Sequence, residues 1–150
     1  MPLLNPVDRA MLAKVGRGCR AAVVASGLPR ATGRVRLRLQ GFLGSVERLS
    51  WARANGFKWN EFTSALVAAG GHLEVLKWAR ENQCPWDQDT CAYAALRGHL
   101  EVLKWARQHD CPWGEQTCAV AAYCRHLEVL RWAVENHCPG AVRYARFLNE

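Results

Sequence analysis

The strongest constraint on this chain is a ten-residue segment that occurs twice without a change. The segment Gly-His-Leu-Glu-Val-Leu-Lys-Trp-Ala-Arg occupies residues 71–80 and recurs at residues 98–107, which is 27 positions later. The same step reaches divergent copies at residues 125–134 and 44–53. A fixed period between about 20 and 50 residues is typical of proteins in which one small unit stacks on copies of itself. The sequence therefore predicts a tandem array with units 44–70, 71–97, 98–124 and 125–150.

The net charge of the chain lies in its N-terminal part. The formal net charge is +7 at pH 7, and residues 1–43 account for all of it, with eight basic side chains against Asp8 alone. Residues 44–150 hold 12 basic and 12 acidic side chains, so the repeats add no positive field. The four arginines between residues 30 and 38 have no aromatic residue among them. Because single-stranded nucleic acids bind to basic grooves with stacking aromatics, nucleic acid is not an expected partner.

Hydropathy and cysteine usage indicate an intracellular protein. No apolar run approaches the roughly 20 residues that a membrane-spanning helix needs, so no membrane partner is predicted. Most of the seven cysteines follow the repeat, with Cys84, Cys111 and Cys138 at one phase and Cys91 and Cys118 at another. Equivalent residues of neighbouring units are too far apart to bond each other. We therefore expect free thiols that pack as small hydrophobes in a reducing compartment, either cytoplasmic or nuclear.

Each unit is predicted to hold two helices. Glu74, Lys77 and Glu81 share one stripe of a helical wheel while aliphatic residues fill the opposite arc, which predicts a helix over residues 73–82, here named the Leu-Glu-Val helix. Gly56 suits a left-handed cap after the copy of this helix in the first unit. Alanines then predict a second, Ala-rich helix over residues 91–97, and their small size allows close approach between units. In the last unit, Val142, Ala145 and Leu148 predict a closing helix.

The repeat resembles a known family. The pattern Ala-Ala-x-x-Gly-His-Leu-Glu-Val-Leu-Lys at residues 94–104 is similar to the centre of an ankyrin repeat, and the resemblance covers about residues 34–150. The period is shorter than the roughly 33 residues of that family, and the missing length falls near residues 84–89, where the family has a β-hairpin finger. The resemblance implies an all-α, ankyrin-like solenoid of stacked helix-turn-helix repeats, with the finger reduced or absent.

Residues 1–33 are predicted to form a separate basic helical segment. Within residues 3–25, Leu-Asn-Pro-Val-Asp is followed by Leu12, Val15, Arg17 and Arg20, a pattern that resembles the later half of an F-box. That resemblance implies an alternative function, in which this segment docks a Skp-type adaptor and the repeats hold a target, as in a substrate-receptor subunit of a ubiquitin ligase. Residues 34–39 alternate in the manner of a strand, but the repeat register favours a short helix that caps the array.

Several repeated side chains have both a functional and a structural interpretation. The tryptophans of the Leu-Glu-Val helices and of the loops could stack on bases or on a proline-rich ligand, but neighbouring units also need large side chains to bury, and packing is the preferred interpretation. Arg80 falls on the apolar arc of its helix and is replaced by Val134 in the last unit, so its stem is predicted to snorkel.

Metal and catalytic chemistry are not predicted. His72, His99 and His126 beside the cysteines suggest zinc, but six residues separate Cys84 from Cys91, more than the usual two to four. A backbone hydrogen bond at the turn between helices is the preferred role of the histidines. Every candidate nucleophile recurs by translation along the array, whereas catalysis needs one converging pocket. We therefore expect no enzyme activity and no cofactor.

The predicted function is a protein-interaction scaffold that uses a surface built from the repeats. Positions that differ between units are free to serve recognition, because packing does not fix them. These positions lie mainly in the loops and the Ala-rich helices. The predicted partner-binding residues are Lys58, Asn60, Glu61, Phe62, Gln88, Asp89, Tyr93, Arg97, Glu115, Gln116 and Tyr123.

Overall fold

The computed structural model of the protein describes residues 43–54 and 56–149. The chain divides between Arg38 and Leu39, and the described residues belong to the second part, Leu39–Glu150. The segment 1–33, including its F-box-like residues 3–25, lies outside the described residues. The short capping helix expected from residues 34–39 also lies outside them.

The described part of the chain is helical throughout. It contains eight α-helices and one 3-10 helix, and no strand occurs in residues 43–54 and 56–149. The prediction of an all-α fold is confirmed, and the loop over residues 84–87 holds no hairpin finger. The elements are α4 (Val46–Ala54), α5 (Glu61–Ala69), α6 (Leu73–Glu81), α7 (Gln88–Leu96), α8 (Leu100–Gln108), α9 (Glu115–Tyr123), α10 (Leu127–Glu135), α11 (Ala141–Tyr144) and η1 (Ala145–Leu148).

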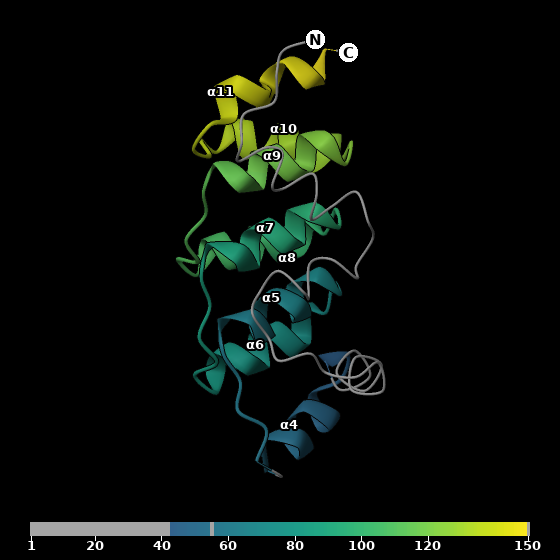
Figure 1. Ribbon diagram of the computed structural model, residues 1–150, viewed down its shortest axis with the longest axis vertical. Coiled ribbons are helices and arrows are strands. Elements are labelled where there is room, and N and C mark those ends of the chain that lie inside the picture. The colour runs from purple at the N-terminus through teal and green to yellow at the C-terminus, as the bar shows by residue number, and fades with distance from the viewer. Residues whose placement is uncertain (1–42, 55, 150) are drawn as a thin grey trace, which may run out of the picture. The chain divides into compact units, whose positions relative to one another are not determined.

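The helices pair into hairpins that pack on one another. Tight turns join α5 to α6, α7 to α8 and α9 to α10, and α7 packs between α5 and α9. Figure 1 shows α5, α7 and α9 one above another, with α6 and α8 behind them. Helix α4 contacts α6 at one end, and α11 contacts α9 and α10 at the other. The packing layer is therefore the hairpin, and a sequence unit such as 71–97 joins the second helix of one hairpin to the first helix of the next.

The two predicted helix types contribute different side chains to the core. The Leu-Glu-Val helices α6, α8 and α10 bury the same three positions, exemplified by Val75, Leu76 and Ala79 of α6. The Ala-rich helices bury small side chains, and this is why α5, α7 and α9 lie against one another. Their buried alanines and valines are Ala65, Val67, Ala68, Ala92, Ala94, Ala95, Ala119, Val120, Ala121 and Ala122.

A left-handed residue ends each Leu-Glu-Val helix. Gly56 has a φ of +90°, which confirms the predicted cap, and Gln83, Asp110 and His137 adopt φ values of 65°, 61° and 56° at the equivalent places. The chain then reverses through hydrogen bonds such as the one from the Cys84 N–H to the Ala79 carbonyl at 2.8 Å. Only the first copy of this cap uses glycine, so the other three hold a conformation that L-residues seldom adopt.

Helix boundaries differ from the predicted ones by a few residues. Helix α7 begins at Gln88, three residues before the predicted start, because Asp87 is its N-cap and accepts from the Asp89 N–H at 3.0 Å. Helix α6 ends at Glu81, one residue before the predicted end. The closing helix predicted from Val142, Ala145 and Leu148 exists as α11 and η1. It buries Tyr144, whereas Val142 is 92% exposed.

Among the described residues, no helix has both the length and the apolar character needed to cross a bilayer.

Candidate functional site

The predicted partner-binding residues lie on the Ala-rich helices and on the loops before them. The exposed members of the set are Lys58, Asn60, Glu61, Gln88, Arg97 and Glu115. The half-buried members are Phe62, Asp89, Tyr93, Gln116 and Tyr123. None of the eleven is fully buried, so each has some surface that a partner could contact.

Helices α5, α7 and α9 share one partly exposed side, which we name the Ala-rich face. In α5 the face holds residues at helical spacing i, i+4 and i+7, which lie on one side of a helix. The members are Phe62, Leu66 and Ala69 of α5, Asp89, Tyr93 and Leu96 of α7, and Gln116, Val120 and Tyr123 of α9. All of them are half-buried except Val120, which is buried. The predicted set lacked Leu66 and Leu96, although their spacing from Phe62 and Tyr93 places them on this face.

Aromatic side chains connect successive helices across the Ala-rich face. The rings of Phe62 and Tyr93 meet edge to face with centroids 6.2 Å apart. Further along, the ring of Tyr123 lies 6.1 Å from Tyr144 and 5.8 Å from Phe147, again in edge contacts. Burial and the nearby Asp89 carboxylate raise the pKa of Tyr93, so its hydroxyl remains a neutral donor at physiological pH. The face therefore offers flat apolar rings together with hydroxyl groups.

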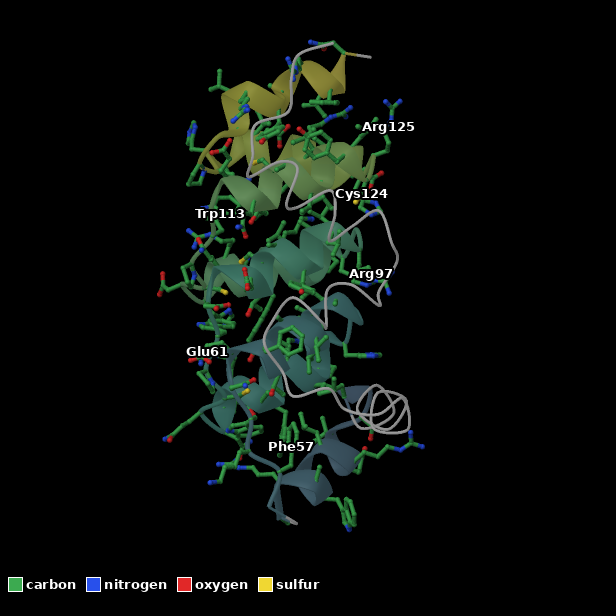
Figure 2. All side chains as sticks on the ribbon, viewed as in Figure 1. Phe57, Glu61, Arg97, Trp113, Cys124 and Arg125 are labelled. Atoms are coloured by element: carbon green, nitrogen blue, oxygen red, sulfur yellow. The ribbon has the colours of Figure 1, made fainter. Side chains whose placement is uncertain are left out.

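All three Ala-rich helices have an acidic residue in the first turn, and α7 and α9 are also followed by a basic residue. Glu61, Asp89 and Glu115 lie in the first turns of α5, α7 and α9, where the helix dipole favours negative charge. Arg97 and Arg125 lie beyond the C-terminal ends of α7 and α9. Figure 2 shows Glu61 on the side of the long loops and both arginines on the opposite side, at the tight turns. A ligand that runs along the Ala-rich helices would thus meet acidic groups at one end and basic groups at the other.

Two of the predicted residues have clear structural roles. Asn60 caps α5, since its side chain accepts from the Thr63 N–H at 3.2 Å while its own N–H donates to the Thr63 hydroxyl at 3.1 Å. Glu115 accepts from Arg143 at 3.0 Å and from the Tyr144 hydroxyl at 3.3 Å. These contacts tie α9 to the closing helix, so both side chains contribute to folding whether or not a partner binds them.

The tryptophans pack in pairs, and arginines cover them. The loop residue Trp86 meets Trp105 of α8 edge to face at 5.8 Å, and the Arg80 guanidinium lies 4.1 Å from the Trp86 ring centroid. Arg80 also donates to the Cys84 carbonyl at 2.6 Å. The same arrangement joins Arg53, Trp59 and Trp78, and it joins Arg107, Trp113 and Trp132.

This pairing extends the predictions made for these two residue types. The tryptophans of α6, α8 and α10 pack on loop tryptophans as predicted, whereas Trp51 of α4 is 58% exposed. The arginine does more than snorkel because its cationic head lies on an indole. In the last unit Val134 replaces the arginine and Gly140 replaces the tryptophan, so both partners are lost together. Each Arg-Trp-Trp cluster links one hairpin to the next.

Two of the three repeated histidines, His99 and His126, bind backbone carbonyls of the preceding hairpin. Nε2 of His99 donates to the Ala69 carbonyl at 3.0 Å, and Nε2 of His126 donates to the Leu96 carbonyl at 3.1 Å. The His99 ring lies so close to Gly71 that a Cβ atom there would be 2.7 Å from it. The predicted backbone hydrogen bond is therefore present, but it joins two hairpins rather than one turn.

The described cysteines are free, as predicted. Five of them are buried and Cys124 is half-buried. The Cys91 thiol donates a hydrogen bond to Cys111, and this bond together with burial raises the pKa of Cys91. A bond donated to Cys138 and burial raise the pKa of Cys118 in the same way. These groups therefore remain neutral thiols at physiological pH.

In the described part of the chain, no three histidine, cysteine or acidic side chains come together in a way that could hold a metal ion. Comparison of the sequence and the structure with protein families, curated proteins and solved structures finds no match.

Proposed function

We propose that the protein is an interaction scaffold that binds another protein through the Ala-rich face. The array of hairpins supporting the face is ankyrin-like in this proposal, with the β-hairpin fingers absent. Such an array presents one row of side chains per layer, and a partner can contact several rows at once.

The supporting observation is the contrast between buried and partly exposed positions of the Ala-rich helices. Buried positions keep the same residue or one that is also small. Threonine recurs at 63, 90 and 117 and alanine at 68, 95 and 122, while Ser64 is followed by two cysteines and Val67 by two alanines. Partly exposed positions vary: Phe62 is followed by Asp89 and Gln116, and Ala69 by Leu96 and Tyr123. Packing thus explains the repeated residues and leaves the varied ones available for recognition.

The chemistry of the face suits a protein ligand. Phe62, Tyr93 and Tyr123 are rigid rings of the kind enriched at the centres of protein interfaces. The flanking Arg97 and Lys58 are exposed and charged, as residues at the rim of an interface usually are. The aromatic residues would supply most of the affinity, and the charged ones the orientation.

The test is a comparison of three variants of the full chain in quantitative affinity capture. One carries Lys58→Glu and Arg97→Glu at the rim, and one carries Phe62→Ala and Tyr93→Ala within the face. The matched control carries Glu74→Lys and Glu101→Lys on the Leu-Glu-Val helices, where both side chains are exposed. Circular dichroism checks that each variant folds. We expect a set of proteins captured by the wild type to be retained by the control but lost from the rim variant and from the variant within the face. Capture of the same set by all three variants would refute the proposal.

A further inference from the structure

A pocket of about 320 Å³ lies on the other side of the hairpins, away from the residues of the Ala-rich face. Helix α8 contributes Lys104, Arg107 and Gln108 to its lining. The following loop contributes Trp113, and α10 with its C-cap contributes Trp132 and Asn136. The lining thus combines two cations, two indoles and two carboxamides, and it contains no carboxylate.

The equivalent place one layer earlier differs at two positions. There Glu81 stands where the pocket has Gln108, and His109 stands where it has Asn136. The His109 ring stacks on Trp105 with centroids 4.2 Å apart, so imidazole covers the indole that corresponds to Trp132. Asn136 instead donates from its side chain to the Trp132 carbonyl at 2.8 Å and leaves no ring over the indole.

The first layer differs again. Ser50 occupies the lysine position, and Arg53 donates to the side-chain oxygen of Asn82 at 3.4 Å. The combination of lysine, arginine, two indoles and uncharged amides therefore arises only between α8 and α10 within the described residues. The two residues that differ from the preceding layer, Gln108 and Asn136, therefore line the same pocket. Gln108 removes a negative charge from it, and Asn136 leaves space that a histidine ring would fill.

The cations of the pocket are positioned for an anion. Arg107 lies 4.6 Å from the Trp113 ring centroid and donates to the Cys111 carbonyl, which fixes its plane and leaves other N–H donors of the guanidinium available. Lys104 pairs with Glu101 at 2.9 Å, but the Glu101 side chain is 76% exposed. An exposed pair of this kind is worth little, so an incoming carboxylate can exchange with Glu101.

We infer that this pocket binds an acidic side chain of a partner protein, carried on a segment with a neighbouring aliphatic residue. The carboxylate lies between Lys104 and Arg107, and the aliphatic group covers the exposed parts of Trp113 and Trp132. Gln108 and Asn136 supply carboxamides for the peptide backbone of that segment. The pocket shares no residue with the Ala-rich face, so this inference does not depend on the function proposed above.

The test uses short synthetic peptides and the indole N–H signals of the full-length protein in nuclear magnetic resonance. The probe is acetyl-Glu-Leu-Glu-Leu-amide, and its counterpart has glutamine in place of both glutamates. We expect the acidic probe to shift the signals of Trp113 and Trp132 with a millimolar dissociation constant, and the neutral counterpart to bind about fivefold more weakly or not at all, as expected for loss of one or two partly solvated charge contacts.

Repeat-derived substitutions provide variants that keep the fold. Gln108→Glu and Asn136→His each introduce the residue found in the preceding layer, and each is expected to weaken probe binding about fivefold or more. Gln108→Glu adds a carboxylate that repels the probe, and Asn136→His places a ring over the indole of Trp132. The reverse pair, Glu81→Gln with His109→Asn, is expected to add shifts at Trp86 and Trp105. Shifts spread over all the indoles, equal binding of both peptides, or binding unchanged by Gln108→Glu and Asn136→His would overturn the inference.

Discussion

The guanidinium of Arg80 lies over the ring of Trp86, 4.1 Å from its centroid, although the two residues come from a helix and from the loop that leaves it. The same relationship recurs between Arg53 and Trp59 at 4.1 Å. A cation over an indole stabilises by about 0.5–2 kcal/mol, depending on desolvation. Because Trp86 also touches Trp105, the contact stabilises the junction of two hairpins.

A double-mutant cycle measures this contribution. Arg80→Met and Trp86→Leu, alone and combined, are expected to show a coupling of about 0.5–2 kcal/mol in the free energy of unfolding by urea. The control cycle pairs Arg53→Met with Trp113→Leu, which belong to different clusters. That cycle should be additive within about 0.5 kcal/mol, and additivity in both cycles would show that the stacking contributes nothing.

Two buried threonines predict stabilising substitutions. The Oγ1 atoms of Thr90 and Thr117 are buried and make no hydrogen bond within the described structure, whereas Thr63 at the equivalent place belongs to the capping box of Asn60. An unsatisfied buried hydroxyl costs about 1–3 kcal/mol. Thr90→Val and Thr117→Val should each raise the free energy of unfolding by about 1 kcal/mol. Thr63→Val should lower it by about 1 kcal/mol, and the same sign at all three positions would contradict this account.

The left-handed caps predict opposite effects of glycine. Gln83 and Asp110 have φ values of 65° and 61°, and Gln83→Gly or Asp110→Gly should stabilise by about 0.5–1 kcal/mol because glycine relieves the strain. Gly71→Ala should destabilise by at least about 1 kcal/mol, since its φ is +73° and the new methyl group would meet the His99 ring. Arg131→Gly, at an exposed position in the middle of α10, is the helical control and should cost about 1 kcal/mol. Thermal unfolding of the four variants measures these differences.

The raised pKa values of the Cys91 and Cys118 thiols make stability depend on pH in the alkaline range. The folded pKa of Cys91 is raised, so above the unfolded thiol value of about 8.5 the unfolded state loses a proton that the folded state keeps. Stability is therefore full below about pH 8.5 and falls as pH rises, by up to about 1.4 kcal/mol per pH unit for each such thiol. Urea unfolding of the wild type and of Cys91→Val between pH 7.5 and 9.5 tests this, with reductant present. A smaller decline is expected in the variant, and identical declines would contradict the assignment.

The period and the helical wheel were sufficient to predict both helix types, the left-handed cap at Gly56 and the burial of the alanines. These features depend on local spacing and on side-chain size, which are visible in one unit. The start of α7 was misplaced because Asp87 acts as its N-cap, whereas the predicted helix began only at Cys91. Backbone capping of this kind depends on which of several adjacent polar residues faces the first turn.

Contacts between layers were harder to predict. The pairing of Arg80 with Trp86 depends on how the loop folds back on its helix, and the wheel alone placed Arg80 among apolar residues. The pocket beside Trp132 arises because Asn136 replaces a stacking histidine, a difference whose meaning appears only in three dimensions. The assignment of the Ala-rich face to a partner stays a prediction.

The placement of His99 and His126 over glycines of the preceding hairpin also bears on how such a chain can grow. His99 approaches Gly71 and His126 approaches Gly98 in the same way, so these two junctions accept the same incoming layer. An internal duplication of 27 residues would create a new junction in which a histidine ring again lies over a glycine. An insertion that is not a multiple of 27 residues would shift the histidine away from its glycine. Lengthening by whole periods therefore adds one more row of variable side chains without requiring any compensating change elsewhere.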